Sequence, residues 1–412
     1  MSRRIAVIGA GQAGLQLALG LITEGFDVRL VTDRSGGEIL DGRVLSTQCM
    51  FDTALQTERD LGANLWEDDC PQIHGIRYSV ARPDGTLAVQ FGGRLGAYAQ
   101  SVDQRLKMPG WMDLFEQRGG TIDYRPVDLA FAEELAAQHD LVVIASGKGD
   151  FARELATIFP RVDAESPYDR PQRQLAVAYV VDMEPLDPPS YFSISIVQRV
   201  GEYFVGPALT KSGRCWTMCL EAIPGGPMDV FAETPLEDLD GWLGLCKQVL
   251  AEFMPWEAER CERIRLTDGK GTLKGALTPV VRERVGRLPS GRLVLGVGDA
   301  VVLNDPLVGQ GANNAAKGTT EVTREFVERG DGPYDESWLR QVGEVYWERV
   351  RWSTRFTNMM LTPPPHVGAV FEAGSRSPAF ADMFAEGTNE PALLFPWLET
   401  PEGVAERAQA IA

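Results

Sequence analysis

The first third of the chain alternates short apolar runs with segments of helical periodicity. Residues 3–8 read RRIAVI, a run of strand length, and an apolar helical segment begins at Leu15. Similar runs follow at 27–31 (DVRLV) and at 140–147 (DLVVIASG), and the second of these ends in a turn of small residues. Apolar strands that alternate with helices are typical of a parallel sheet covered on both faces. The pattern therefore predicts an α/β fold.

The pattern changes in the middle of the chain, where strand-like runs follow one another with only turns between them. These runs are 174–182, 191–197, 203–205 and 215–222. From Tyr334 onward the periodicity is helical, with an interruption at residues 363–365 (PPP). We expect a discontinuous cofactor domain, a β-rich substrate domain laid over it and a C-terminal helical region. Their expected bounds are residues 1–165 with 286–333, residues 166–285, and residues 334–412.

A glycine-rich turn joins the first strand to the first helix. Gly9, Gly11 and Gly14 form a GxGxxG motif directly after a strand and before a helix. In that context the first glycine permits the tight turn, the second lets the backbone approach a pyrophosphate and the third lets the helix pack on the strand. The N–H groups of the helix N-terminus then face the phosphates. The motif predicts a dinucleotide site, whereas the same glycines without this context would be a chance cluster.

The end of the second strand bears on how the dinucleotide ribose is held. An acidic residue is expected there to bind the ribose hydroxyls. The run 27–31 is followed by Thr32 at the expected position and by Asp33 one residue later. Either the carboxylate is shifted to Asp33 or the hydroxyl of Thr32 replaces it. A solvated Asp33 in a turn is the alternative.

A second strand–loop–helix segment favours a flavin. Residues 292–296 (RLVLG) form a strand, Asp299 follows, and residues 305–315 read DPLVGQGANNA. This pattern resembles the second flavin-contacting segment of FAD-dependent aromatic monooxygenases. The resemblance implies that Asp299 binds the ribityl chain and that a helix N-terminus faces the flavin ring, where it stabilises negative charge. An ordinary strand–turn–helix is the alternative. The residues added to the expected site are Pro306, Leu307, Val308, Gly309, Gly311, Ala312 and Asn313.

Composition excludes several classes of function. The chain has 412 residues, of which 44% are hydrophobic, and its formal net charge is −18. Such an acidic chain is a poor partner for nucleic acid or for an anionic membrane surface, and it has no apolar run long enough to cross a bilayer. The opening residues MSRR lead into a strand rather than a signal peptide. We therefore expect a soluble cytoplasmic protein.

The residue types also limit the chemistry. The six cysteines include no CxxC pair and the three histidines are not near a cysteine pair, so no metal site is expected. No Ser-His-Asp set, HExxH or P-loop motif is present. Oxygen transfer from a reduced flavin needs no general base, but it does need a dry and well-shaped pocket. Only one strand-linked GxGxxG occurs, so no separate nicotinamide domain is expected.

From end to end, the chain resembles the styrene/indole monooxygenases, the oxygenase components of two-component flavoprotein monooxygenases. The resemblance is carried by residues 9–14, 31–34 (VTDR), 146–148 (SGK), 171–173 (PQR), 296–313 and 355–358 (RFTN). It implies FAD used as FADH₂, O₂ activated as a flavin C4a-hydroperoxide, and a separate NADH:flavin reductase as a transient partner. We further expect Arg43 and Arg105 to bind the cofactor. The oligomeric state is left open, with a homodimer as one option.

Six positions separate the styrene and indole types of this family. Here they are Ser46, Gln48, Met50, Ile73, Ile76 and Ala99. The styrene type would carry Asn, Val, His, Tyr, His and Ser in their place, so the resemblance is to the indole type. It implies that the first three lie with Pro306 at the reacting centre, and that the last three line the substrate pocket with Leu307 and Val308. We expect Gln48 to accept a hydrogen bond from the indole N–H, or to hold a water.

The expected activity is FADH₂-dependent epoxidation of indole, with styrene-like alkenes and aryl sulfides as further substrates. A single-component NAD(P)H-dependent hydroxylase of the same fold is one alternative. A flavin-dependent halogenase is another, although the WxWxIP motif of that family is missing. A non-catalytic flavin-binding protein is the third, and the presence of a substrate-sized second domain argues against it.

Overall fold

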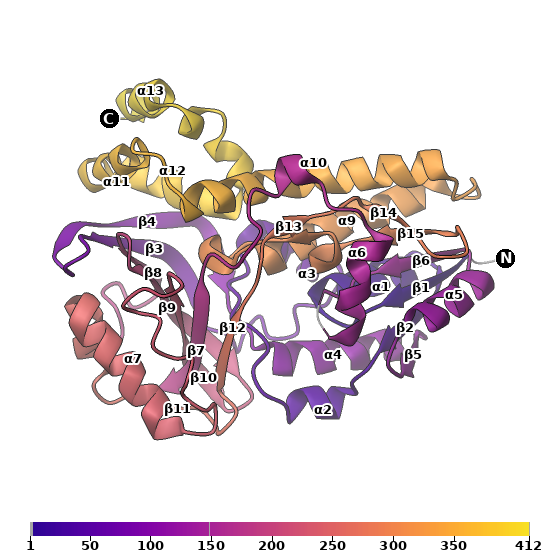
Figure 1. Cartoon of the computed structure of the whole chain (residues 1–412), viewed down its shortest axis with the longest axis horizontal. Coiled ribbons are helices and arrows are strands. Elements are labelled where there is room, and N and C mark those ends of the chain that lie inside the picture. Colours follow the sequence, from indigo (N-terminus) through magenta and orange to yellow (C-terminus); the bar gives the residue numbers. More distant parts are fainter. Residues whose placement is uncertain (1–2, 148, 412) are drawn as a thin grey trace.

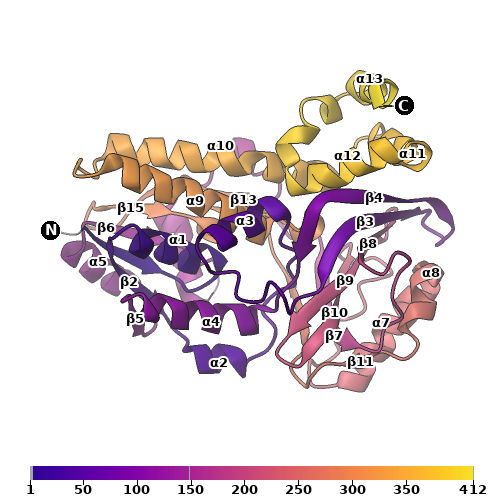
Figure 2. The ribbon, with the colours of Figure 1, turned by 180° about the vertical axis from the view of Figure 1, so that it is seen from behind.

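The computed structural model describes residues 3–147 and 149–411. Lys148, which belongs to the SGK segment named above, lies outside the described residues. Figure 1 shows two sheets side by side, with a layer of helices from the second half of the chain running along one face of both. The N-terminus lies at the first sheet, and the C-terminal helices lie over the second, as the reverse view also shows (Figure 2).

The first sheet has six strands among the described residues, and five of them run parallel. Residues 5–8 of its central strand are all buried. Helices cover both faces of such a sheet, so the strand is apolar throughout instead of alternating. The strand order is β14 (Val285–Arg287), β15 (Leu293–Gly296), β6 (Leu141–Ile144), β1 (Arg4–Ile8), β2 (Asp27–Thr32) and β5 (Thr121–Tyr124), with β14 antiparallel to β15.

Two helices of this unit matter most for the site. Helix α1 (Gln12–Thr23) follows β1 and contacts α9 (Gly311–Arg329), which follows the strand–loop segment near residue 300. Because both helices start at the carboxyl ends of the parallel strands, their N-termini lie at the same edge of the sheet. The other α-helices up to residue 158 are α2 (Gly36–Leu40), α3 (Asp52–Asp60), α4 (Gln104–Gln117), α5 (Leu129–Gln138) and α6 (Leu155–Ile158).

The second sheet has eight strands over the described ranges. Its members are β3 (Gln72–Ala81), β4 (Leu87–Gln100), β7 (Gln174–Val181), β8 (Tyr191–Val197), β9 (Gly201–Thr210), β10 (Gly213–Ala222), β11 (Arg265–Leu266) and β12 (Thr272–Ala276). The order is β11-β7-β10-β9-β8-β3-β4, and β12 also pairs with β7. One face of this sheet packs on α7 (Leu239–Phe253) and α8 (Pro255–Ala258) around the buried Trp242. Two short strands, β13 (Val280–Val281) and β16 (Val302–Leu303), pair with each other and belong to neither sheet.

The structure corrects one part of the expected domain division. Residues 72–100 were expected in the cofactor domain because they precede residue 165. They instead form β3 and β4, and β3 pairs in parallel with β8 of the second sheet. This pairing joins segments more than a hundred residues apart in sequence, and no local pattern reveals such a partner. The other expected domain bounds stay predictions.

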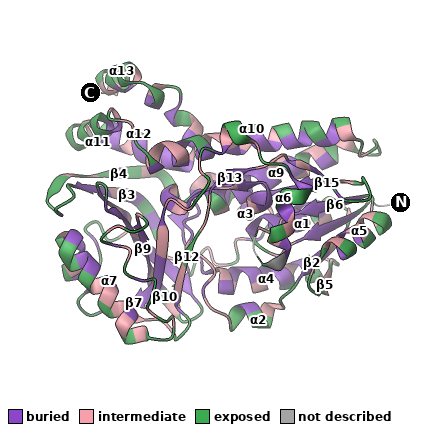
Figure 3. Cartoon of the chain, viewed as in Figure 1, coloured by how far each residue is buried: buried purple, intermediate pink, exposed green. Residues whose placement is uncertain are grey.

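The C-terminal region is helical as the periodicity indicates. Its helices are α10 (Glu336–Leu361), α11 (Val367–Arg376), α12 (Pro378–Asn389) and α13 (Pro401–Ile411). Helices α11 and α12 pack on β4 through an aromatic cluster that includes Tyr78, Phe91 and Phe384. Figure 3 shows buried residues concentrated in the strands and in the facing sides of the helices, with exposed residues on α13 and the outer side of α10. The C-terminal helices thus close one face of the second sheet.

Within residues 3–147 and 149–411, none of the helices has the length and apolar character needed to span a lipid bilayer. The same described residues contain no cluster of three or more His, Cys, Asp or Glu side chains arranged to hold a metal ion. All six cysteines are buried thiols.

Candidate active site

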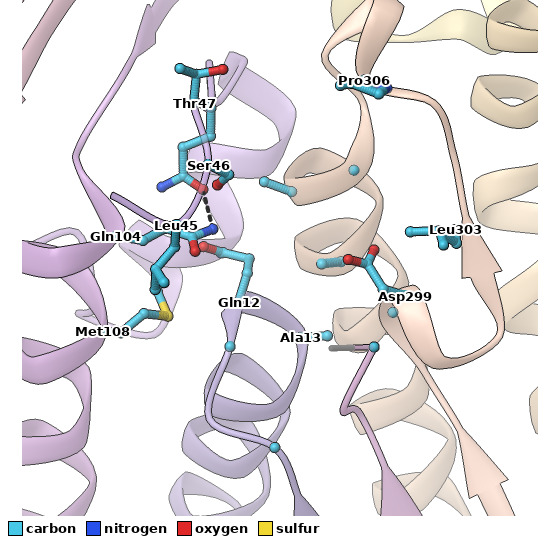
Figure 4. Close-up of a pocket in the computed structure, with 18 of the residues that line it drawn as sticks. Gln12, Ala13, Leu45, Ser46, Thr47, Gln104, Met108, Asp299, Leu303 and Pro306 are labelled. Carbon is cyan, nitrogen blue, oxygen red and sulfur yellow. Dashed lines mark hydrogen bonds between the residues drawn. The ribbon is translucent and has the colours of Figure 1, made fainter. Parts of the chain in front are cut away.

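One large cavity lies between the two sheets, at the carboxyl ends of the parallel strands. Its volume is about 660 Å³. The first sheet contributes residues that follow β1, β2, β6 and β15, and the second sheet contributes side chains of β8, β9 and β10. Figure 4 shows Gln12 at the start of α1, with Ser46 and Gln104 on one side and Asp299 and Pro306 on the other. The cavity therefore joins both expected cofactor segments to the second sheet.

The GxGxxG turn forms one end of this cavity. Gly9 has a φ of +113°, and a Cβ there would lie 2.9 Å from the backbone N of Ser146. A Cβ at Gly14 would lie 1.8 Å from the carbonyl oxygen of Gly9. Both positions therefore require glycine for close packing. Gly11 differs, because among the described residues no heavy atom lies within 4 Å of its Cβ position and the residue lines the cavity.

The loop before α9 forms a second glycine-lined edge. Gly309 adopts a left-handed conformation with φ +65°, and neither Gly309 nor Gly311 has a described heavy atom within 4 Å of its Cβ position. Asn313 holds this loop: its Nδ2 donates to the carbonyl oxygen of Gly309 at 3.0 Å and to that of Cys49 at 2.8 Å. Its Oδ1 accepts from the N–H of Phe51 at 2.9 Å. The loop and the 45–51 segment are thus tied together across the cavity.

These features fit FAD. Open space beside Gly11, Gly309 and Gly311 is what a bound dinucleotide would fill, and the N-termini of α1 and α9 would supply N–H groups and positive dipole ends. Thr32 and Asp33 line the cavity at the end of β2, where a ribose would lie, and Asp299 lines it after β15. These groups therefore suit the parts of FAD: a diphosphate, a ribose, a ribityl chain and the anionic edge of the ring.

The second sheet supplies an apolar wall. Phe192 and Ile194 on β8 and Phe204 on β9 line the cavity together with Ile76 on β3. Ile76 pairs with Phe192 and Ile194 pairs with Phe204, so these side chains project from one face of the sheet. An aromatic molecule of modest size is the natural occupant of such a wall.

A buried carboxylate cluster ends this wall. Arg173 donates to both oxygens of Glu202, at 2.7 and 2.9 Å. Glu221 lies opposite Glu202 in the β9–β10 pairing, and it lines the cavity while only 1% exposed. Burial, followed by the charges of Asp305 and Glu202, raises the pKa of Glu221 well above its usual 4.5. Burial also raises the pKa of Asp305 to about 6. Burial thus favours the protonated form of both carboxyl groups over the charged form.

Sequence comparison identifies the family. Residues 148–260 match the family model described as "Styrene monooxygenase A putative substrate binding domain". The chain is 30% identical to the styrene monooxygenase StyA of Pseudomonas fluorescens, over 98% of this chain and 97% of that protein. A StyA from another Pseudomonas is equally similar. The chain belongs to the styrene monooxygenase family. The predicted family is therefore confirmed, while the indole type within it stays a prediction.

Solved structures confirm the fold. A flavoprotein/dehydrogenase of Cytophaga hutchinsonii superposes with a TM-score of 0.72 at 13% identity, covering 99% of this chain and 98% of that one. The flavin-dependent halogenase CmlS superposes with a TM-score of 0.66 at 15% identity, covering 95% and 76%. The predicted α/β FAD-binding fold with C-terminal helices is thus confirmed. The family match supports an FAD-dependent monooxygenase that uses FAD and O₂.

Most of the expected site residues of this styrene monooxygenase family member line the single cavity described above. The expected residues that line it are Gly9, Gly11, Thr32, Asp33, Ser46, Gln48, Ile76, Asp299, Pro306, Val308, Gly309, Gly311 and Ala312. Those that do not line it are Gly14, Arg43, Met50, Ile73, Ala99, Arg105, Leu307 and Asn313. Gly14 and Asn313 support the cavity without lining it: Gly14 lets α1 pack on β1, and Asn313 holds the loop before α9 by hydrogen bonds.

The expectation that two arginines bind the cofactor is not supported by their positions. Arg105 is fully buried between the carboxylates of Asp103 and Asp268, with N–O distances of 2.8 and 3.0 Å. Arg43 donates to Thr272 Oγ1 at 2.7 Å and to Glu237 at 3.0 Å. Both side chains are held by protein partners, and neither lines the cavity. Arg105 links α4 to the loop at Asp268, and Arg43 links its own segment to Thr272 at the start of β12.

Three of the six type-specific positions lie behind the cavity wall. Ile73 pairs directly with Ala99 across β3 and β4, and both are fully buried. Met50 forms an isolated bridge with Gln100, the residue after Ala99. Ile73 and Ala99 therefore pack in one buried cluster, whereas Met50 points to the other face of the strand and packs with Ala54, Leu55 and Ala316. None of the three lines the cavity.

Sequence reasoning missed several cavity residues. Gln12 lines the cavity with a buried Oε1 that has no hydrogen-bond partner among the described residues, while its Nε2 donates to Glu58 at 3.0 Å. Thr217, Cys219 and Glu221 alternate along β10 and all line the cavity. Their two-residue spacing is the signal that would have placed them on one face.

We predict that Gly11→Ala weakens FAD binding by about 1–3 kcal/mol while leaving the fold intact, because its methyl group enters space meant for the diphosphate and meets no protein atom. Titration with FAD measures the affinity, and circular dichroism and thermal unfolding check the fold. Gly244→Ala is the matched control, since its Cβ position in α7 is equally open but distant from the cavity. FAD affinity unchanged in Gly11→Ala would contradict the cofactor site.

We predict that Glu221→Gln stabilises the protein relative to wild type at pH 7–8, and by more than it does near pH 4.5. The folded-state pKa is raised, so between pH 4.5 and that raised pKa the folded protein holds a proton that the unfolded chain has lost. Stability therefore falls as pH rises through this window, and the neutral amide avoids that loss. Unfolding free energies across pH 4.5–8 measure the difference, which should shrink toward pH 4.5. A constant difference at all pH values would contradict the raised pKa of Glu221.

Proposed function

We propose that this protein is the oxygenase of a two-component, FADH₂-dependent monooxygenase that epoxidises indole at its 2,3 bond. Styrene-like aryl alkenes and aryl sulfides are further substrates. The observation that carries this proposal is one cavity lined at one end by the glycines of both cofactor segments and at the other by the apolar wall of the second sheet.

The residues at the first end would hold the cofactor. Gly11 and the α1 N-terminus would bind the diphosphate, Thr32 or Asp33 the ribose, and Asp299 the ribityl chain. The loop from Pro306 to Gly311 would lie against the ring. The reduced flavin supplies one capacity to this site, which is the activation of O₂ for transfer of one oxygen atom.

The residues at the second end orient the substrate and exclude water. Ile76, Phe192 and Phe204 offer a wide apolar surface, and Val308 adds another apolar side chain from the flavin-facing loop. A π-rich substrate stacked there would be shielded from solvent beside the loop. This exclusion of water protects an activated oxygen from hydrolysis, and no acid–base residue of the chain needs to act directly on the substrate double bond.

The substrate class rests on the type-specific positions. Of these, Ser46, Gln48 and Ile76 line the cavity, whereas Met50, Ile73 and Ala99 are buried and do not line it. The chain carries Met50, Ile73 and Ile76 where the styrene type would carry His, Tyr and His. Indole is therefore the substrate that this combination favours, although apolar pockets discriminate weakly between molecules of similar shape.

The expected role of Gln48 as hydrogen-bond acceptor for indole stays a prediction. In the structure its Nε2 donates to the carbonyl oxygen of Val102 at 2.9 Å, and its Oε1 accepts from Gln104 Nε2 at 3.2 Å. Both polar groups of the side chain are thus engaged. These bonds hold the 45–49 segment against the start of α4.

We predict that FAD and NADH with the purified chain give negligible NADH oxidation, because the proposed protein relies on a separate reductase. Adding an unrelated NADH:flavin reductase should start product formation from indole, with one atom of ¹⁸O₂ in the product. Indigo, formed by oxidation of the indole product, gives a visible signal. Rapid NADH oxidation by the chain alone would favour a single-component hydroxylase, and flavin binding without any product would favour a non-catalytic protein.

We predict that Ile76→Ala raises the share of O₂ released as H₂O₂ during indole turnover, because it opens the apolar wall to water. Ile73→Ala is the matched control on the same strand: it removes the same atoms from a residue that does not line the cavity. Both variants should lose about 2–5 kcal/mol of stability. An equal rise of H₂O₂ in both would show that the effect comes from destabilisation and not from the wall.

A further inference from the structure

We propose that Glu221 is a specificity-determining residue, whose free carboxyl oxygen accepts a hydrogen bond from the ring N–H of a flat bicyclic aromatic substrate. The proposal rests on the proposed function, because it assigns a role within the same cavity. It moves substrate recognition from the 45–50 segment, where the type-specific residues lie, to a strand of the second sheet.

The geometry isolates one oxygen of this side chain. Cys219 Sγ contacts Glu221 Oε1 at 3.7 Å, whereas Oε2 has no hydrogen-bond partner among the described residues. The side chain is 1% exposed and lines the cavity, but Oε2 itself is almost inaccessible, so the carboxyl group must turn toward the cavity before Oε2 can accept a hydrogen bond from a ligand. A buried polar atom without a partner is destabilising, so a ligand that supplies the missing partner gains affinity.

The surrounding charges decide which kind of ligand group fits. The groups that face Glu221 are Glu202 on β9, Asp305 in the flavin-facing loop and Arg173, together with the thiol of Cys219. Arg173 is already bound through two hydrogen bonds to Glu202. With Arg173 paired to Glu202, the carboxyl group of Asp305 gives this region a negative potential, which attracts the positive end of an N–H dipole and repels a lone pair of a ligand oxygen.

The rest of the wall favours a ring that carries only one polar group. Phe204 lies opposite Cys219, two pairs along the same β9–β10 ladder from Glu202 and Glu221 and so on the same face. Phe204 and Phe192 line the cavity with Glu221. An aromatic ring against these side chains would have its edge within the region of the carboxyl group. A single N–H on that edge would find an acceptor there, whereas a hydrocarbon ring would leave Oε2 unpartnered.

Equilibrium dialysis of the FAD-loaded, oxidised protein tests this without turnover. The ligands are indole, indene and benzofuran, which share one shape but carry an N–H, a CH₂ and an oxygen acceptor. Wild-type protein should bind indole about 3- to 10-fold more tightly than the other two, the scale of one hydrogen bond. Glu221→Leu should bring the three affinities together, and Glu221→Gln should keep the indole preference because its amide oxygen still accepts.

Two further variants separate the proposal from its competitors. Thr217→Val is the matched control on the same face of β10 and should keep the preference, and so should Gln48→Leu. Loss of the preference in Gln48→Leu with retention in Glu221→Leu would overturn the proposal. Tighter binding of benzofuran than of indole by wild-type protein would also overturn it, since Glu221 would then be a donor. Because dialysis needs no reductase and no O₂, a failure of the proposed oxidation would leave these binding results readable.

Discussion

The close packing of α1 on the end of β1 is the constraint on which the site depends. A Cβ at Gly14 would lie 1.8 Å from the carbonyl oxygen of Gly9, so this helix can start where it does only because both positions lack side chains. The packing aims the α1 N-terminus at the cavity and leaves Gly11 open beside it. The loop held by Asn313 places the α9 N-terminus at the same cavity. Two helix ends and open glycines thus form a cradle for an anionic dinucleotide before any substrate contact is considered.

The second sheet turns this cradle into a site for oxygen transfer. Because β3 pairs with β8, residues from the first hundred positions and from the middle of the chain form one wall. That wall is apolar at Ile76, Phe192 and Phe204 and ends in the buried acid Glu221. An apolar wall excludes water, and burial favours the uncharged form of the Glu221 carboxyl group, which adds a polar group to the wall. Under the proposed function, the same arrangement would admit a wide range of aromatic substrates and favour one that carries a ring N–H.

Local patterns made the parallel sheet and the cofactor end predictable. The apolar strands are buried on both faces, and the motif of Gly9 to Gly14 has a steric meaning that does not depend on distant residues. What could not be predicted depends on contacts between distant segments. Arg105 was expected at the cofactor, but its charge is taken by Asp268, 163 residues away. Glu221 was missed because its acidity depends on Glu202, Asp305 and the burial of all three, which no single strand reveals.

The central claim is that the cavity brings an aromatic substrate to the activated oxygen of a bound flavin. A single-turnover experiment tests it most directly: anaerobic enzyme with one equivalent of bound FADH₂ is mixed with O₂ in the presence of indole, and the indole product and H₂O₂ are measured per flavin reoxidised. The account predicts close to one oxidised indole per flavin with little H₂O₂, and H₂O₂ in place of product when indole is left out. Stoichiometric H₂O₂ with unchanged indole in the presence of substrate would contradict it.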